Sequence, residues 1–302
     1  MLSFSLQARG KRASLGMLLA GFVVLCMLLA ACGSSGGGAP TSATPTVAPP
    51  TDLITSGVLT VGSDTTYPPQ EYIDTATGHA TGFDVDLITA IAQRMGLRAN
   101  VVTTGFDTII DSLVAKRFDV VISAVSVTPE RQKKVDFVPY FNAGESLLVK
   151  AGNPLNIKSV TDLCGQKVGV QDGTIEQTDL QTASSNCTKA NKPAIQITIL
   201  KDQTAVVQLL ASGRVVATYQ DSPVTDYYNK QNPGQFAVGG SVVNAGIEGI
   251  VVRKGDTSMF NAIQAAFNAL KTDRTYHNLI LKWGLTNEEI SMLDRRATYA
   301  YA

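Results

Sequence analysis

The sequence predicts an α/β fold of two similar lobes with a ligand cleft between them. The order strand, helix, strand, helix, strand occurs between residues 58 and 123 and again between residues 167 and 219. In both copies polar side chains follow the ends of predicted strands, which is where parallel sheets bind ligands. Two such sheet edges that face one another would enclose a cleft.

The first copy begins with an apolar strand at 58–62. A helix is expected at 83–95 and a second at 108–116, because apolar residues recur there every three or four positions. Strands are expected at 97–102 and 118–123, and the second of these is apolar enough to be buried in a parallel sheet.

Polar residues follow the strand at 118–123 directly. Thr128 suits a helix N-cap and Pro129 the first helical turn, so free backbone N–H groups are expected beside Ser126 and Arg131. A guanidinium can donate two parallel hydrogen bonds to a carboxylate. This corner suits a small carboxylate, although an ordinary turn with a solvated arginine is the alternative.

The second copy and the segment after it complete the predicted fold. Its elements are expected at 167–171, 175–184, 195–200, 203–211 and 215–219. A strand at 249–253 and helices at 258–270 and 276–283 belong to neither copy, and we expect them to pack on the first lobe. The predicted lobes are therefore 52–143 with 246–285, and 144–245, with two crossing strands between them and a tail at 286–302.

The N-terminus has the features of a targeting segment. Three basic residues precede an apolar run at 15–31, which ends in Leu-Ala-Ala before Cys32 and resembles a bacterial lipoprotein signal. Cleavage would leave a lipid-modified Cys32 at the start of a flexible tether at 32–51. An uncleaved membrane anchor is the alternative, and either reading places the rest outside the cytoplasm.

The charge balance excludes some partners. The chain has 25 basic and 25 acidic residues, and removal of residues 1–31 leaves 22 basic residues against 25 acidic ones. A slightly acidic chain argues against nucleic acid or anionic lipid as the target.

Two cysteines remain for the folded part. Outside the cytoplasm, Cys164 and Cys187 are expected to form a disulfide worth about 3 kcal/mol, although two buried thiols are the alternative. The only histidines, His79 and His277, lie far from both in sequence, so no metal site is expected. No cofactor is expected either.

Six segments in order carry a resemblance to a known family. They are VGSDTTYPP at 61–69, GFDVDL at 82–87, FDVVISAVSVTPER at 118–131, VGVQDGT at 168–174, YQD at 219–221 and the run from 275 to 284. Residues 52–285 resemble a periplasmic-type (type 2) solute-binding protein of the polar amino acid ABC transporter family, bacterial extracellular solute-binding protein family 3. The resemblance implies an amino acid ligand and a permease partner, with no reaction, and we expect a monomer.

The resemblance also implies ligand-binding positions. In the family's pattern Arg131 would hold the ligand's carboxylate and Asp221 its ammonium group, from opposite lobes. Asp64, Tyr67 and Phe106 would surround its side chain, although a turn residue, a surface tyrosine and a core phenylalanine are the alternatives. The remaining implied positions are Ser123, Ala124, Ser126, Gly173, Thr174 and Ile175. If Asp64 faces the side chain, a basic or amide amino acid is favoured.

Three positions depart from the family's pattern. Gln70 stands where an aromatic residue is common, and Ala124 where a hydroxyl residue or glycine often sits. Glu248 is an unexpected acid whose role the sequence leaves open. The main rival function is a dehydratase of the prephenate or arogenate type on the same fold. Such an enzyme needs a positioned acid and base beside the bond that breaks.

Overall fold

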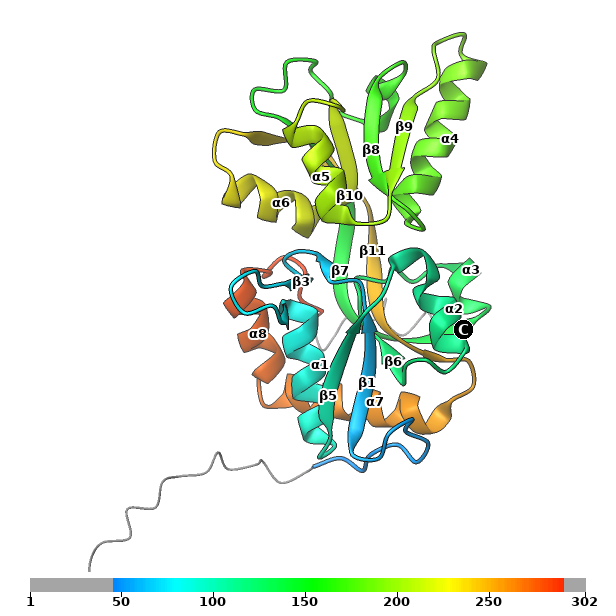
Figure 1. Cartoon of the computed structure of the whole chain (residues 1–302), viewed down its shortest axis with the longest axis vertical. Coiled ribbons are helices and arrows are strands. Elements are labelled where there is room, and N and C mark those ends of the chain that lie inside the picture. The colour runs from blue at the N-terminus through cyan, green and yellow to red at the C-terminus, as the bar shows by residue number, and fades with distance from the viewer. Residues whose placement is uncertain (1–45, 291–302) are drawn as a thin grey trace, which may run out of the picture. The chain divides into compact units, whose positions relative to one another are not determined.

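This computed structural model describes residues 46–290. An eight-stranded sheet runs through both lobes of this part of the chain (Figure 1). The predicted signal segment, Cys32, most of the tether and the end of the tail therefore lie outside the described residues. The strand order is β5-β1-β6-β11-β7-β10-β8-β9. The strands are β1 Val58–Ser63, β5 Arg98–Thr103, β6 Val120–Val121, β7 Val135–Lys150, β8 Lys167–Gln171, β9 Gln196–Leu200, β10 Ala217–Asp221 and β11 Phe236–Arg253.

Helices flank this sheet in two groups. Lobe 1 contains β1, β5 and β6 with α1 Phe83–Arg94, α2 Ile109–Val114, α3 Pro129–Gln132, α7 Thr257–Thr272 and α8 Thr275–Trp283. Lobe 2 contains β8, β9 and β10 with α4 Ile175–Lys189, α5 Gln203–Ala211 and α6 Ser222–Gln231. Short 3-10 turns lie at Phe106–Thr108 and Val160–Leu163, and lobe 1 also has a small sheet of β2 Thr66–Tyr67, β3 Glu71–Ile73 and β4 Ala80–Thr81.

Two long antiparallel strands, β7 and β11, belong to both lobes. At one end β11 pairs with β6 of lobe 1, and at the other β7 pairs with β10 of lobe 2 (Figure 1). Strands β1, β5 and β6 are parallel to one another, as are β8, β9 and β10. The predicted fold, two α/β lobes joined by two strands, is confirmed. The predicted lobe boundaries fall inside β7 and β11.

The core of lobe 1 joins residues from both ends of the described chain. Leu59 of β1 and Phe83 of α1 share one buried cluster with Phe267 of α7 and Tyr276 of α8. The rings of Phe267 and Tyr276 meet edge to face, with centroids 5.0 Å apart. Complete burial of one such side chain stabilises the fold by about 2 kcal/mol. The two last helices therefore pack on lobe 1.

A second core lies under β8 and α4 in lobe 2. Val168, Leu180 and Tyr219 are buried there. Cys164 and Cys187 form a disulfide at the edge of this core, across a sequence separation of 23 residues. This bond ties the segment before β8 to the last turn of α4.

Several elements differ from the prediction. The strand expected at 118–123 is reduced to β6, and Ala124, three residues after its end, has a φ of 47°. Two crossing strands were predicted, but the bounds of β7 and of most of β11 were not, and helix α6 was not predicted. Within residues 46–290 no helix has the length and apolar composition that crossing a bilayer requires.

Candidate functional site

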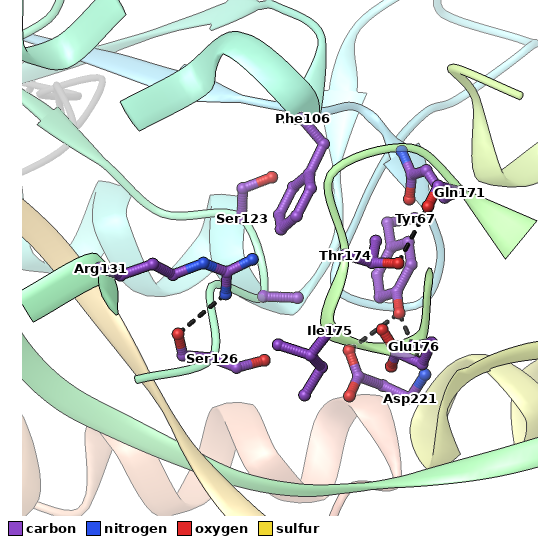
Figure 2. A pocket seen from close by; sticks show the side chains of 11 residues that line it. Tyr67, Phe106, Ser123, Ser126, Arg131, Gln171, Thr174, Ile175, Glu176 and Asp221 are labelled. Atoms are coloured by element: carbon purple, nitrogen blue, oxygen red, sulfur yellow. Dashed lines mark hydrogen bonds between the residues drawn. The ribbon is translucent and has the colours of Figure 1, made fainter. Parts of the chain in front are cut away.

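Eleven residues from both lobes line a small cavity between them (Figure 2). They are Tyr67, Phe106, Ser123, Ala124, Ser126, Arg131, Gln171, Thr174, Ile175, Glu176 and Asp221. The cavity volume is about 10 Å³, which is room for about one water molecule. Entry of anything larger therefore requires the lobes to separate or side chains to move.

Arg131 lies on the lobe 1 side of the cavity. Thr128 caps the short helix α3, since its Oγ1 accepts a hydrogen bond from the Arg131 N–H at 3.2 Å, as the sequence predicted. The guanidinium donates to the Ser126 carbonyl at 2.8 Å and lies 5.4 Å from the centre of the Phe106 ring. Its Nη2 also donates across the lobes to the Gly173 carbonyl at 3.2 Å. The guanidinium is thus aimed at the cavity by lobe 1 (Figure 2).

Asp221 ends β10 on the lobe 2 side. Its Oδ2 accepts a hydrogen bond from the Tyr67 hydroxyl at 2.8 Å, and its N–H donates to the same hydroxyl oxygen at 3.1 Å. Burial raises the pKa of Asp221 to about 6, while the Tyr67 hydroxyl and the charge of Arg131 act in the opposite direction. A cation and an acid from opposite lobes therefore face one cavity.

Ser123 and Ala124 line the cavity, but buried acids occupy their donor groups. The Ser123 hydroxyl donates to Glu71 Oε1 at 2.8 Å, and the Ala124 N–H donates to Asp84 Oδ2 at 3.1 Å. The Ser123 oxygen also accepts from the Asp64 N–H at 2.8 Å. In this geometry the Ser123 hydroxyl and the Ala124 N–H are therefore already hydrogen bonded to acids of lobe 1.

Glu71, Asp84 and Glu248 form what we call the lobe 1 acid cluster. Tyr140 connects two of them, since its hydroxyl lies 2.7 Å from Asp84 Oδ2 and 3.4 Å from Glu248 Oε2. Glu248 also accepts from Gln70 Nε2 at 2.5 Å. No ion pair found among residues 46–290 includes a member of this cluster.

Burial dominates the electrostatics of this cluster. It raises the pKa of Asp84 to about 7 and the pKa values of Glu71 and Glu248 well above the ordinary glutamate value, and neighbouring acids add to the shifts of both glutamates. Because no cation balances them, the three carboxyls retain protons at neutral pH more readily than exposed acids do.

Asp64 does not line the cavity. Gln171 lies between Asp64 and the cavity, since it lines the cavity and its Nε2 donates a hydrogen bond to Asp64 Oδ2. Thr66 Oγ1 donates to the other oxygen, Asp64 Oδ1, at 2.9 Å. Burial raises the pKa of Asp64 to about 6, although both hydrogen bonds act to lower it. Both carboxylate oxygens of Asp64 are thus already hydrogen bonded.

The first turn of α4 supplies the lobe 2 wall. Thr174 is its N-cap and accepts from the Gln177 N–H at 3.2 Å, so Ile175 is the first helical residue. The N–H groups at a helix start favour anions. Gly173 does not line the cavity itself but lines a neighbouring groove, and its φ of 81° allows the tight turn into the helix.

Glu176, the next residue of α4, was not predicted but lines the cavity. It is only 2% exposed, and none of the donor groups of residues 46–290 reaches its Oε1. Burial raises its pKa well above the ordinary value, and the charge of Asp221 adds to that shift. An acid in the first turn of a helix is common, so nothing in the sequence indicates that this one faces the cleft.

The structure thus brings nine of the eleven predicted positions to one cavity and leaves out Asp64 and Gly173. Gln171 and Glu176 are lining residues that the sequence did not single out. Gln171 ends β8 at the same sheet edge as Gly173, and that placement is the signal that was missed.

The sequence profile of the bacterial extracellular solute-binding proteins, family 3, matches residues 59–286. The chain belongs to this family. The predicted resemblance is therefore confirmed.

Individual relatives agree with this assignment. The chain is 33% identical over 228 residues to the L-cystine-binding protein TcyJ of Escherichia coli (strain K12), which covers 75% of this chain and 82% of that protein. An ancestral arginine-binding protein bound to arginine superposes with a TM-score of 0.70 at 37% identity, over 75% of this chain and 98% of the other. The ancestral amino acid-binding protein AncCDT-1, a precursor of cyclohexadienyl dehydratase, gives 0.68 at 36% identity, over 75% and 95%.

Proposed function

We propose that this protein captures a polar α-amino acid outside the cytoplasm and delivers it to the permease of an ABC transporter. One observation carries the proposal: Arg131 of lobe 1 and Asp221 of lobe 2 face the same cavity. An α-amino acid has one carboxylate and one ammonium group a few bonds apart. Each protein charge would be fully paired only when a ligand lies between the lobes, which favours closure.

The comparisons support this ligand class. Two of the relatives described above are binding proteins for cystine and arginine, and the third is an amino acid-binding protein. In this proposal Arg131 holds the ligand's carboxylate, together with the Ile175 N–H at the start of α4. Asp221 accepts from the ammonium group, while Tyr67 and Phe106 pack on the side chain, which is basic or an amide.

We also propose that a lipid on Cys32 holds the protein at the outer face of the cytoplasmic membrane or in the periplasm. The basis is the apolar segment and the small residues before Cys32. Two or more acyl chains anchor a protein stably. Replacement of Cys32 by Ser should release the protein from the membrane fraction, and continued membrane association of C32S would contradict the anchor.

Binding is tested by thermal unfolding of the full chain, purified in detergent, with each common amino acid. A ligand at one hundred times its dissociation constant adds about 2.7 kcal/mol to the apparent stability. Arg131→Ala should abolish this shift, because it removes the carboxylate partner. Lys133→Ala is the matched control, since Lys133 is an exposed cation two residues further along.

Two outcomes would overturn the proposal. The first is the absence of a shift with every amino acid, and the second is a shift that survives in Arg131→Ala. The dehydratase alternative has a separate test, because one structural neighbour is a precursor of such an enzyme. Turnover of prephenate by the purified protein would favour the enzyme, and we expect none.

A further inference from the structure

The charges around the cavity are unequal. Arg131 is the one cation among its lining residues, whereas Asp221 and Glu176 are both acids. Burial lowers the pKa of Arg131, but an arginine keeps its proton at neutral pH. If both acids are ionised, one negative charge in this enclosed site has no partner, and an unpaired buried charge is strongly unfavourable.

Glu176 is the less completely hydrogen-bonded of the two acids. Asp221 accepts a hydrogen bond from Tyr67, whereas no donor of the described residues reaches Glu176 Oε1. Asp221 is also a hydrogen-bonding neighbour of the Glu176 carboxyl. Two carboxyls can form that bond only when one of them is protonated. A cationic ligand group would supply the missing donor and allow both acids to ionise.

The surroundings of Glu176 contain few groups that could balance it. Asp221 and Glu145 raise its pKa, whereas a hydrogen bond from its own backbone N–H and the charge of Arg131 lower it. The charge of Glu176 also acts on Tyr67, Tyr219 and Glu248, and none of these three groups carries a positive charge. Asp64 is a weaker candidate for a ligand's second cation, because Thr66 and Gln171 already occupy its oxygens and it does not line the cavity.

We propose that Glu176 makes this site selective for amino acids that carry a second cationic group in addition to the α-ammonium. Such a ligand has one carboxylate for Arg131 and two cationic groups for the two acids, so the closed site is neutral with both acids ionised. An amide ligand has no second cation, and Glu176 then keeps its proton. This inference rests on the proposed function and narrows its ligand class from basic or amide to basic.

The test compares L-arginine with L-glutamine by titration calorimetry on the full chain in detergent. The wild-type protein should bind arginine at least tenfold more tightly than glutamine, with a ratio of roughly ten to a hundred for one balanced buried charge. Calorimetry in two buffers of different ionisation enthalpy counts protons. At pH 7 the arginine complex should form with about one proton more released than the glutamine complex, because Glu176 is ionised only in the former.

Glu176→Gln should remove both differences. Its arginine to glutamine ratio should fall to about one, and the difference in proton release should disappear. Glu130→Gln is the matched control, because it makes the same substitution at an exposed position outside the cavity and should change neither quantity. Asp64→Asn tests the competing assignment and should leave the proton difference in place.

The outcomes separate the two proposals. Equal affinity of the wild-type protein for arginine and glutamine would overturn the role of Glu176, and so would a proton difference that is lost in Asp64→Asn but kept in Glu176→Gln. In either case the binding function would stand. Failure of the wild-type protein to bind any amino acid would overturn both proposals. If Glu176→Gln does not fold, the wild-type proton count decides alone, since equal proton release with both ligands contradicts the inference.

Discussion

Replacement of Glu248 by Gln should make the free energy of unfolding less sensitive to rising pH. Glu248 is 1% exposed, accepts from Gln70 Nε2 and has the carboxyls of Asp84 and Asp221 among the charges that raise its pKa. Glu248 Oε1 and Gln70 Oε1 have no hydrogen-bond donor among the described residues. A glutamine at position 248 could keep the bond from Gln70 and donate its own amide N–H to Gln70 Oε1.

The magnitude follows from proton linkage. The folded protein holds protons on its buried carboxyls at pH values where the unfolded chain has lost them, so the free energy of unfolding falls as pH rises above about 4. For each such carboxyl the free energy of unfolding falls by about 1.4 kcal/mol per pH unit, until the pH passes the pKa of that carboxyl in the folded protein. This pKa is about 7 for Asp84. Loss of one carboxyl should therefore reduce the fall in unfolding free energy between pH 5 and 7 by up to about 3 kcal/mol.

Urea unfolding at pH 5, 6, 7 and 8 measures this slope. Glu248→Gln should be more stable than the wild type at pH 8, and the two should converge toward pH 5. Glu130→Gln is the exposed control and should keep the wild-type slope. A variant with the full wild-type slope would refute the reasoning, because the proton would then reside on Glu71 or Asp84 alone.

Three further predictions concern closure, ligand contact and stability. Gly173→Ala should lower amino acid affinity at least tenfold in calorimetry, because a Cβ there would lie 2.8 Å from Asp107 Cα of lobe 1 and hold the lobes apart. Ile175→Pro should weaken binding without a loss of thermal stability, since proline is tolerated at the first helical position but lacks the N–H proposed to hold the carboxylate. Reduction of the Cys164–Cys187 disulfide should lower the unfolding free energy by about 3 kcal/mol in urea titrations, while unchanged stability would contradict the chain-entropy argument.

Local sequence patterns predicted the elements that bury one regular face. Helix α5 has its predicted bounds, and α1 and α8 differ from theirs by one residue at one end, because their apolar spacing is regular. The long strands β7 and β11 were not predicted as such. Residues 241–246 of β11 are exposed, so that strand has no continuous apolar pattern where it runs between the lobes.

In the candidate site, too, some placements could be predicted from local sequence and others could not. Arg131 and Asp221 follow predicted strands, and ligands bind at the ends of parallel strands, so the sequence predicted that both face a ligand site. In the structure both line one cavity. Whether an acid near such an edge faces the cavity depends on the contacts of the lobes with one another. Asp64 is covered by Gln171 from lobe 2, and Glu176 faces the cavity from lobe 2. Both placements depend on how the two lobes meet. No spacing within one lobe encodes that geometry.

Contacts across the cleft also compete with a ligand. Tyr67 and Asp221 share two hydrogen bonds, Gln171 bonds to Asp64, and Lys201 bridges Asp107 of lobe 1 and Asp172 of lobe 2. The cavity has room for about one water, so the lobes must separate or side chains must move before an amino acid enters. Each cross-lobe bond that stabilises closure without a ligand reduces the fraction of molecules able to accept one, and the apparent affinity falls by that fraction. In the proposed function, the ligand's ammonium group would therefore have to replace the Tyr67–Asp221 contact with a stronger, charged one.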